Sequence, residues 1–292
     1  MGITLKIETD RPAMVTSYLN GILQQMKLCK HFFLNDWKIK QEFELGEKIN
    51  NIIPVKNLKT AEATKLFENI SRDVNFALAN EFALLCEKIG IDFIEALEAA
   101  NTQPYSHLLL PGIVGGRITK DPYLLIEEAE NVNVNLRMTI LARKINDGML
   151  RHTLSLVRKA LRRCSRTFRR SKVSVFGVSS RPNIKEAEGS LTKELVDMLH
   201  KRGVRVRVYD PFFTPSELKE MGYPVGSTLT KTVQGVDCLI IAVGHDKFKK
   251  LNLKRIKFQV RKPAAIVDMS RVINPARAEK EGFMYFGVGR GI

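Results

Sequence analysis

The sequence predicts an α/β protein, with a helical middle domain followed by a domain built on a doubly wound parallel sheet. Apolar residues recur at helical spacing between residues 60 and 166. From Val173 onward, short apolar runs typical of buried strands alternate with helical segments. Such alternation indicates a parallel sheet with helices on both of its faces.

The helical region contains three expected helices. The first begins at Thr60, a plausible N-cap, and ends at Gly90, and the second covers 92–101. A glycine-rich loop, 111–122, follows and would let the backbone approach a ligand. The third pattern, 135–166, contains no proline, and a helix of about 30 residues would be roughly 45 Å long. We expect a homodimer assembled through this helix, because one C-terminal domain offers too little surface to cover its apolar stripe.

The C-terminal region contains the expected sheet. Its predicted strands are 173–178, 204–210, 238–244 and 264–270. The clearest intervening helix, 190–203, has Gly203 in the left-handed stop position. Ligands of doubly wound sheets bind at the carboxyl ends of the strands, so we expect a site in the loops after Val178, Asp210 and Val243.

The chain is strongly basic, with 47 Lys and Arg against 31 Asp and Glu and a net charge of +16. This surplus implies an acidic ligand or surface, and the phosphates of a nucleotide would qualify. Basic residues gather in 158–172, "RKALRRCSRTFRRSK". We interpret that run as a solvated linker face rather than a nucleic-acid surface.

The cysteines indicate a reducing, cytoplasmic environment. Cys29, Cys86, Cys164 and Cys238 are scattered and form no CxxC pair. No signal-peptide pattern and no apolar run long enough for a membrane helix is present in the sequence. We find no cluster with metal-ligand spacing and no layout of a nucleophilic triad.

Two polar groupings are candidate sites. Lys65 and Asn69 share one helix face, which is either a cleft or an ordinary solvated stripe extended by other polar residues, namely Arg72, Asn75, Asn80 and Glu81. Ser179, Ser180 and Arg181 follow the first strand of the sheet and suit contact with a phosphate. His245, directly after another strand, is expected to be structural. No G-x-G-x-x-G dinucleotide fingerprint occurs anywhere in the chain.

Read together, the motifs of the chain resemble one family. From about residue 58 to the end they occur in the following order: "TAEATKLFENISRDVNFALANEFALLCEKIGID", "PGIVGGRITKDPYLL", "ARKINDGM", "KVSVFGVSSRPN", "VYDP", "GVDCLIIAVGHDKF", "IVDMSRVINP" and "FGVGR". This order resembles the UDP-glucose/GDP-mannose dehydrogenase family. The helix "FENISRDVN" is most similar to that of members that oxidise GDP-mannose or UDP-N-acetyl-hexosamines.

The resemblance implies an oxidoreductase of polysaccharide biosynthesis that oxidises the C6 alcohol of a nucleotide sugar to a carboxylate with NAD. Such an enzyme has an NAD-binding domain, a helical dimerisation domain and a Rossmann-like domain that binds the nucleotide. On this basis we assign 59–166 to the helical domain and 167–292 to the Rossmann-like domain. Residues 1–58 are unassigned, and a remnant of the NAD-binding domain is one interpretation.

The resemblance also implies roles for individual residues. Lys65 and Asn69 match the pair that holds the oxygen that becomes charged during hydride transfer. Asp121 matches the aspartate of the catalytic loop. Gly115 and Gly116 match the glycine pair that packs against the sugar.

Two further positions come from the same resemblance and show how the sequence departs from the family. Arg181 matches a basic position facing the nucleotide. In the loop "GGRITKD" one residue is missing and no cysteine is present, and counting back four from Asp121 reaches Arg117, which cannot form a thiohemiacetal. Glu188 stands where an arginine is expected near the nucleotide.

These departures leave three functions open. The first is a truncated or degenerate nucleotide-sugar dehydrogenase, or one half of a split enzyme whose NAD domain is a separate polypeptide. The second is a non-catalytic nucleotide-sugar-binding or dimerisation partner, and the third is a basic nucleic-acid-binding protein on the same scaffold. We expect the chain alone not to reduce NAD. We further expect weak binding of a nucleotide diphosphate, at about millimolar to tens of micromolar, with Arg181 as the main charged contact.

Overall fold

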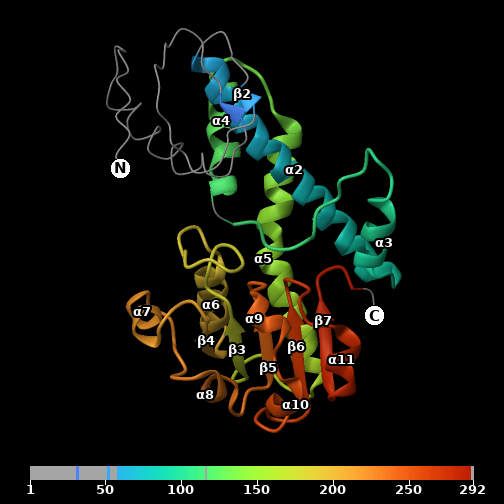
Figure 1. Ribbon diagram of the computed structural model, residues 1–292, viewed down its shortest axis with the longest axis vertical. Helices are drawn as coiled ribbons and strands as arrows, with labels where there is room; N and C mark the ends of the chain where they lie inside the picture. Colours follow the sequence, from blue (N-terminus) through green and yellow to red (C-terminus); the bar gives the residue numbers. More distant parts are fainter. Residues whose placement is uncertain (1–30, 33–50, 53–57, 116, 291–292) are drawn as a thin grey trace. The chain divides into compact units, whose positions relative to one another are not determined.

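The computed structural model describes residues 31–32, 51–52, 58–115 and 117–290 (Figure 1). These fall into two compact units, Met1–Phe67 and Glu68–Ile292. In the first unit, the short strands β1, His31–Phe32, and β2, Asn51–Ile52, pair in parallel. Most of segment 1–58, which we left unassigned, lies outside the described residues.

The helical region consists of long helices joined by the glycine-rich loop. Its elements are α2 (Leu58–Ile89), α3 (Phe93–Ala100), the 3-10 turn η1 (Arg117–Thr119), α4 (Asp121–Asn131) and α5 (Arg137–Arg163). Helix α2 begins at Leu58, so the expected N-cap at Thr60 is wrong. Its predicted end is confirmed, because Gly90 takes a left-handed conformation with φ of 78°. None of the described helices is long and apolar enough to cross a membrane.

The C-terminal region forms a five-stranded parallel sheet with the order β4-β3-β5-β6-β7. The strands are β3 (Lys172–Phe176), β4 (Arg205–Tyr209), β5 (Cys238–Ile241), β6 (Ala264–Asp268) and β7 (Phe283–Gly287). The connecting helices are α6 (Thr192–Lys201), α7 (Pro215–Glu220), α8 (Leu229–Val233), α9 (Asp246–Lys249), α10 (Leu253–Ile256) and α11 (Pro275–Lys280). The four expected strands are confirmed; β7 was recognised only as part of a motif.

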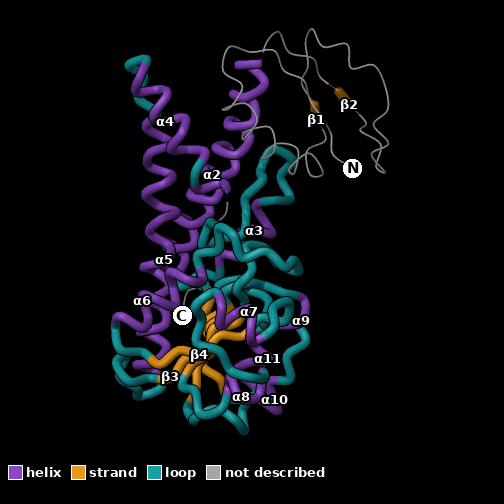
Figure 2. The backbone as a smooth tube through the Cα atoms, turned by 90° about the vertical axis from the view of Figure 1, so that its left-hand side faces the viewer, coloured by secondary structure: helices purple, strands orange, loops and turns teal. Residues whose placement is uncertain are grey.

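The sheet is buried on both faces because side chains alternate along each strand. In β5, Cys238 and Ile240 belong to one apolar cluster, whereas Leu239 and Ile241 belong to the other. The first cluster includes residues of α5 and α6, and the second includes residues of α8, α9, α10 and α11. Figure 2 shows the strands between these two groups of helices. The doubly wound arrangement is therefore confirmed.

Helix α5 belongs to the core of the sheet domain as well as to the helical region. Its C-terminal half is buried within the first cluster through Met149, Leu150, Leu154, Leu156, Val157, Ala160 and Leu161. Our argument that a single chain offers too little surface to cover this stripe is wrong, because the sheet of the same chain covers much of it. The homodimer itself stays a prediction.

The carboxyl end of the sheet is fixed to helices α2 and α3. Gly289, just after β7, accepts a hydrogen bond from the Phe93 amide at 2.8 Å, and its own amide donates to Glu87 Oε1 at 2.9 Å. A Cβ on Gly289 would lie 2.8 Å from Phe93 Cβ, so this close approach requires glycine. Arg271, after β6, binds both carboxylate oxygens of Asp92 at 2.5 and 2.7 Å. These contacts hold α3 and the C-terminal end of α2 against the carboxyl end of the sheet.

Candidate functional site

The glycine-rich loop lies against the sheet domain. A Cβ on Gly115 would come within 2.8 Å of the Gly189 carbonyl oxygen, so only glycine allows this approach between the two loops. Gly116 lies outside the described residues. Arg117 begins η1, and its side chain is likewise outside the description. The loop therefore connects the helical region to the segment that follows β3.

Two of the predicted catalytic residues meet beside this loop. Asn69 Nδ2 donates a hydrogen bond to Asp121 Oδ2, although 52 residues separate them in the chain. Asn69 is buried and lies in α2, whereas Asp121 is the first residue of α4. Lys65 lies in α2 within the first unit, and its placement beside this pair stays a prediction.

A buried polar network, which we call the α2–α5 network, links helices α2 and α5 to the glycine-rich loop. Arg143 Nη1 lies 2.5 Å from Asp73 Oδ1, and Asn146 Nδ2 donates to the same oxygen at 2.9 Å. Asn80 donates to Asn146 Oδ1 at 2.9 Å, and its own Oδ1 accepts the Gly112 amide at 2.7 Å. Hydrogen bonds thus run without interruption from α5 through α2 to the glycine-rich loop.

This network resolves the two interpretations of the polar residues on α2. Asn80 is fully buried and hydrogen-bonded, whereas Arg72, Asn75 and Glu81 are exposed. Part of the polar stripe is therefore buried and supports the loop, and the rest is a solvated face. Sequence reasoning missed Asp73, although an acidic residue inside an apolar helix face is a signal for such a buried pair.

Burial raises the pKa of Asp73, even though the Arg143 guanidinium and the Asn146 amide act in the opposite direction. Removing two charges from water costs free energy that their attraction only partly offsets. The pair depends on both partners being present.

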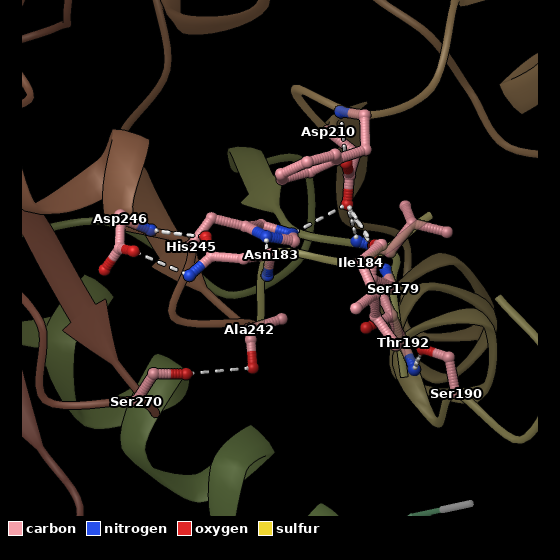
Figure 3. A network of polar contacts seen from close by, with 12 residues as sticks. Ser179, Asn183, Ile184, Ser190, Thr192, Asp210, Ala242, His245, Asp246 and Ser270 are labelled. Carbon is pink, nitrogen blue, oxygen red and sulfur yellow. Dashed lines mark hydrogen bonds and ion pairs between the residues drawn. The ribbon is translucent and has the colours of Figure 1, made fainter. Parts of the chain in front are cut away.

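A second network, the strand-end network, lies in the loops after β3, β4 and β5 (Figure 3). Asp210 Oδ2 accepts the amides of Val178 at 2.6 Å and Ser179 at 3.2 Å, and lies 3.1 Å from His245 Nε2. The backbone amide of Asn183 donates to His245 Nδ1 at 2.9 Å. Because Nδ1 accepts, the proton of the neutral ring is on Nε2 and is donated to Asp210.

Asp210 and His245 therefore hold the loop after β3 in place through their hydrogen bonds to its backbone. Burial raises the pKa of Asp210, but hydrogen bonds from His245 and from the Val178 and Phe212 amides outweigh burial and leave that pKa below the ordinary value. Both side chains are fully buried. The structural role expected for His245 fits this placement, whereas the roles of Asp210 and Asn183 were not foreseen.

The sheet domain does not fit NAD. In dinucleotide-binding domains the acidic residue after the second strand accepts hydrogen bonds from a ribose. Asp210 occupies this place but is buried, and it binds His245 and backbone amides instead. Gly177 opens the loop after β3, where a Cβ would lie only 2.5 Å from Val243 Cβ. Neither the fingerprint nor an open acidic group is present to hold the cofactor there.

The side chains expected to contact a phosphate already have hydrogen-bond partners within the chain. Ser179 Oγ donates to the Ile184 carbonyl at 2.7 Å and so closes its own loop. Arg181 is more than half exposed, and its Nη2 binds Glu186 Oε2 at 3.0 Å, which also accepts Ser180 Oγ at 3.2 Å. An incoming phosphate would have to compete with Glu186 for Arg181.

Thiol and metal chemistry find no support in the described part of the chain. Cys86, Cys164 and Cys238 are buried, and burial raises the pKa of each thiol. None of them belongs to the glycine-rich loop. No group of three or more potential metal ligands occurs among the described residues.

Family comparisons agree with this architecture. Residues 59–148 match the central domain of the UDP-glucose/GDP-mannose dehydrogenase family, and residues 174–275 match its UDP binding domain. The chain belongs to this family. The family match explains why the sheet domain lacks a dinucleotide site, since in this family that domain binds UDP.

Individual relatives carry dehydrogenase names. The chain is 35% identical to the UDP-N-acetyl-D-mannosamine dehydrogenase of Methanocaldococcus jannaschii, over 82% of this chain and 53% of the relative. It is 29% identical to the UDP-N-acetyl-D-glucosamine 6-dehydrogenase of Pseudomonas aeruginosa, over 76% of this chain and 53% of the relative. A solved UDP-D-ManNAc dehydrogenase from Pyrococcus horikoshii superposes with a TM-score of 0.72 at 34% identity, covering 82% of this chain and 54% of that one. The chain spans about half the length of the relatives it matches.

Proposed function

We propose that this chain is the substrate-holding part of a nucleotide-sugar 6-dehydrogenase, with NAD held by a separate chain. The observation that carries the proposal is the hydrogen bond between Asn69 and Asp121, beside a glycine-rich loop that packs on the sheet domain. Residues expected to act on the sugar thus come together next to a domain of the UDP-binding type. In this proposal the nucleotide lies in the loops after β3, β4 and β5.

The chain's own residues would hold and orient the sugar. Lys65 and Asn69 would donate hydrogen bonds to the C6 oxygen as it becomes charged. Asp121, which accepts from Asn69, would orient that amide. Gly115 and Gly116 would admit the sugar, with Arg117 beside them. NAD supplies hydride acceptance when it is bound, and the loop 111–122 offers no thiol to capture an aldehyde.

A non-catalytic nucleotide-sugar-binding partner is the second candidate. The missing thiol favours it, because without a covalent intermediate the conversion of aldehyde to carboxylate has no nucleophile in this loop. Both candidates require the nucleotide to bind. They differ in whether an added NAD-binding subunit restores hydride transfer.

We expect calorimetry to detect binding of UDP or GDP, at about millimolar to tens of micromolar affinity. The Arg181→Ala variant should bind the nucleotide several-fold more weakly, because Arg181 is the charged group in the loop. Glu186→Gln should bind it several-fold more tightly, because that change frees Arg181 and removes a negative charge beside the phosphates. Lys254→Ala, on α10, is the matched control for loss of one exposed cation.

In the same preparations, mixing the chain with NAD and UDP- or GDP-sugars should produce no NADH above a Lys65→Ala control. Steady NADH formation by the chain alone would contradict the need for a separate cofactor-binding subunit. Absence of nucleotide binding, or equal affinity in the Arg181→Ala and Glu186→Gln variants, would contradict the proposed site itself.

We also propose a homodimer, with its interface on α2 in place of the predicted helix 135–166, whose C-terminal half packs on the sheet. The support is a set of apolar side chains that stay exposed on α2, namely Leu78, Phe82, Leu85 and Ile89. Light scattering at micromolar concentration should give twice the 33.1 kDa chain mass. Phe82→Glu combined with Leu85→Glu should shift the mass to the monomer, because burying two carboxylates opposes association. A monomeric wild-type chain at this concentration would refute the homodimer.

A further inference from the structure

A basic pocket lies at the edge of the sheet opposite the proposed nucleotide site. It has a volume of about 510 Å³ and is lined by Arg158, Arg162, Arg166, Thr167, Phe168, Arg169 and Arg202. The segment 166–169 precedes β3, and Arg202 precedes β4. Because the strands are parallel, this is the amino edge of the sheet, whereas the loops after Val178 and Asp210 lie at the carboxyl edge. The proposed nucleotide site does not use these residues.

Five arginines line this pocket without an acidic residue among them. Arg166 is fixed by an ion pair from its Nε to Asp237 Oδ1 at 3.1 Å and by a hydrogen bond from Nη2 to the Lys262 carbonyl at 3.1 Å. Within the described ranges, the guanidinium groups of Arg162 and Arg169 have no hydrogen-bond or ion-pair partner. Like charges gathered in this way repel one another unless an anion lies between them.

Two further arginines of the pocket are held by contacts within the chain, one against an aromatic ring and one near the end of a helix. The Arg158 guanidinium lies 5.3 Å from the centre of the Phe168 ring. Arg202 Nη1 donates to the Met198 carbonyl at 3.0 Å, near the end of α6. These contacts hold two of the five guanidinium groups in fixed positions and reduce the ordering cost of binding an anion.

The backbone of this segment supplies an independent observation. Ser165 and Arg170, which flank 166–169, both adopt left-handed conformations, with φ of 53° and 72°. Residues with a Cβ take this conformation at a cost in free energy, and such strain gathers at functional sites. The strained positions bracket the segment that contributes Arg166 and Arg169.

From these observations we infer that the basic pocket binds the di- or triphosphate group of a small molecule. Planar guanidinium groups match phosphate oxygens in pairs, and the pocket volume is that of a small-molecule site. A surface for single-stranded nucleic acid instead combines a groove that follows several phosphates with aromatic rings free for stacking. Here the one ring in the lining, Phe168, already has Arg158 over it.

Calorimetry of the full chain with inorganic tripolyphosphate at physiological salt tests this inference. We expect saturable binding that falls about tenfold or more in the variant Arg162→Gln with Arg169→Gln. Lys254→Gln with Arg255→Gln, on α10, is the matched control with the same loss of charge and should bind as the wild type does.

Two outcomes would overturn the inference. The first is equal loss of tripolyphosphate affinity in the Arg162/Arg169 variant and in the control, since binding would then follow net charge alone. The second is a short DNA duplex that binds more tightly than tripolyphosphate and loses that affinity in the Arg162/Arg169 variant, because the surface would then serve nucleic acid. Circular dichroism of each variant establishes that the fold is kept.

Discussion

Asp73→Ala should destabilise the chain by about 3–5 kcal/mol, because it leaves the Arg143 charge buried without its buried carboxylate partner. Only 3% of the Arg143 side chain is exposed, so water cannot replace the lost carboxylate. The same change removes one acceptor of Asn146 and loosens the α2–α5 network beneath the glycine-rich loop. Urea denaturation at neutral pH measures the free energy of unfolding directly.

Two variants test whether the unpaired buried charge, and not a general loss of side-chain volume, causes this destabilisation. Asp147→Ala removes the other carboxylate that Arg143 contacts, but Asp147 is half exposed, so its loss should cost no more than about 1 kcal/mol. Replacing both partners, with Asp73→Leu and Arg143→Met, should recover most of the lost stability, since no charge stays buried. If the double variant is as unstable as Asp73→Ala, the buried charge is not the cause.

Asp210→Asn should cost about 3 kcal/mol and weaken nucleotide binding, because an amide group cannot accept all the hydrogen bonds that the carboxylate receives. An NH2 group would then face either the Val178 and Ser179 amides with His245, or the Phe212 amide. The loop after β3 would lose its anchor. Asp246→Asn removes a neighbouring but exposed carboxylate and should have a much smaller effect on both measurements.

The pH dependence of stability gives an independent check on Asp210. Its pKa is lowered in the folded state, so its ionised form stabilises the fold fully above the unfolded-state pKa of about 3.9. This contribution is lost as the pH falls through the lower folded-state pKa. The wild type should therefore lose stability more steeply than Asp210→Asn below about pH 4. Parallel curves for the two proteins would show that Asp210 does not couple to folding.

The arrangement of the C-terminal sheet was predicted from the sequence to a large extent. Each central strand is a short apolar run, and the helices of the sheet domain are marked by glycine stops and N-caps. The local preferences of these segments therefore agree with the tertiary fold. Strand β7 was missed as a strand. Its sequence, "FMYFG", is as apolar as the others, but we identified that region by its motif.

The candidate site was predicted only where residues occupy the family's positions along the chain. Asn69 and Asp121 were assigned in this way, and the fold then brought them into hydrogen-bond contact across 52 residues. Asp73, Asp210 and Asn183 could not be found from spacing. Their partners lie on other elements, and a lone acidic residue in the sequence does not reveal whether it is buried.

The sequence by itself therefore determined four of the five strands of the sheet domain, its helix α6, the glycine-rich loop and the absence of a cysteine in that loop. Only the tertiary structure decided which polar residues are buried, that α5 packs on its own sheet, and that Arg181 pairs with Glu186. The physical reason is that periodicity depends on neighbouring residues within one element. Burial and charge pairing depend instead on elements that meet only after the chain has folded.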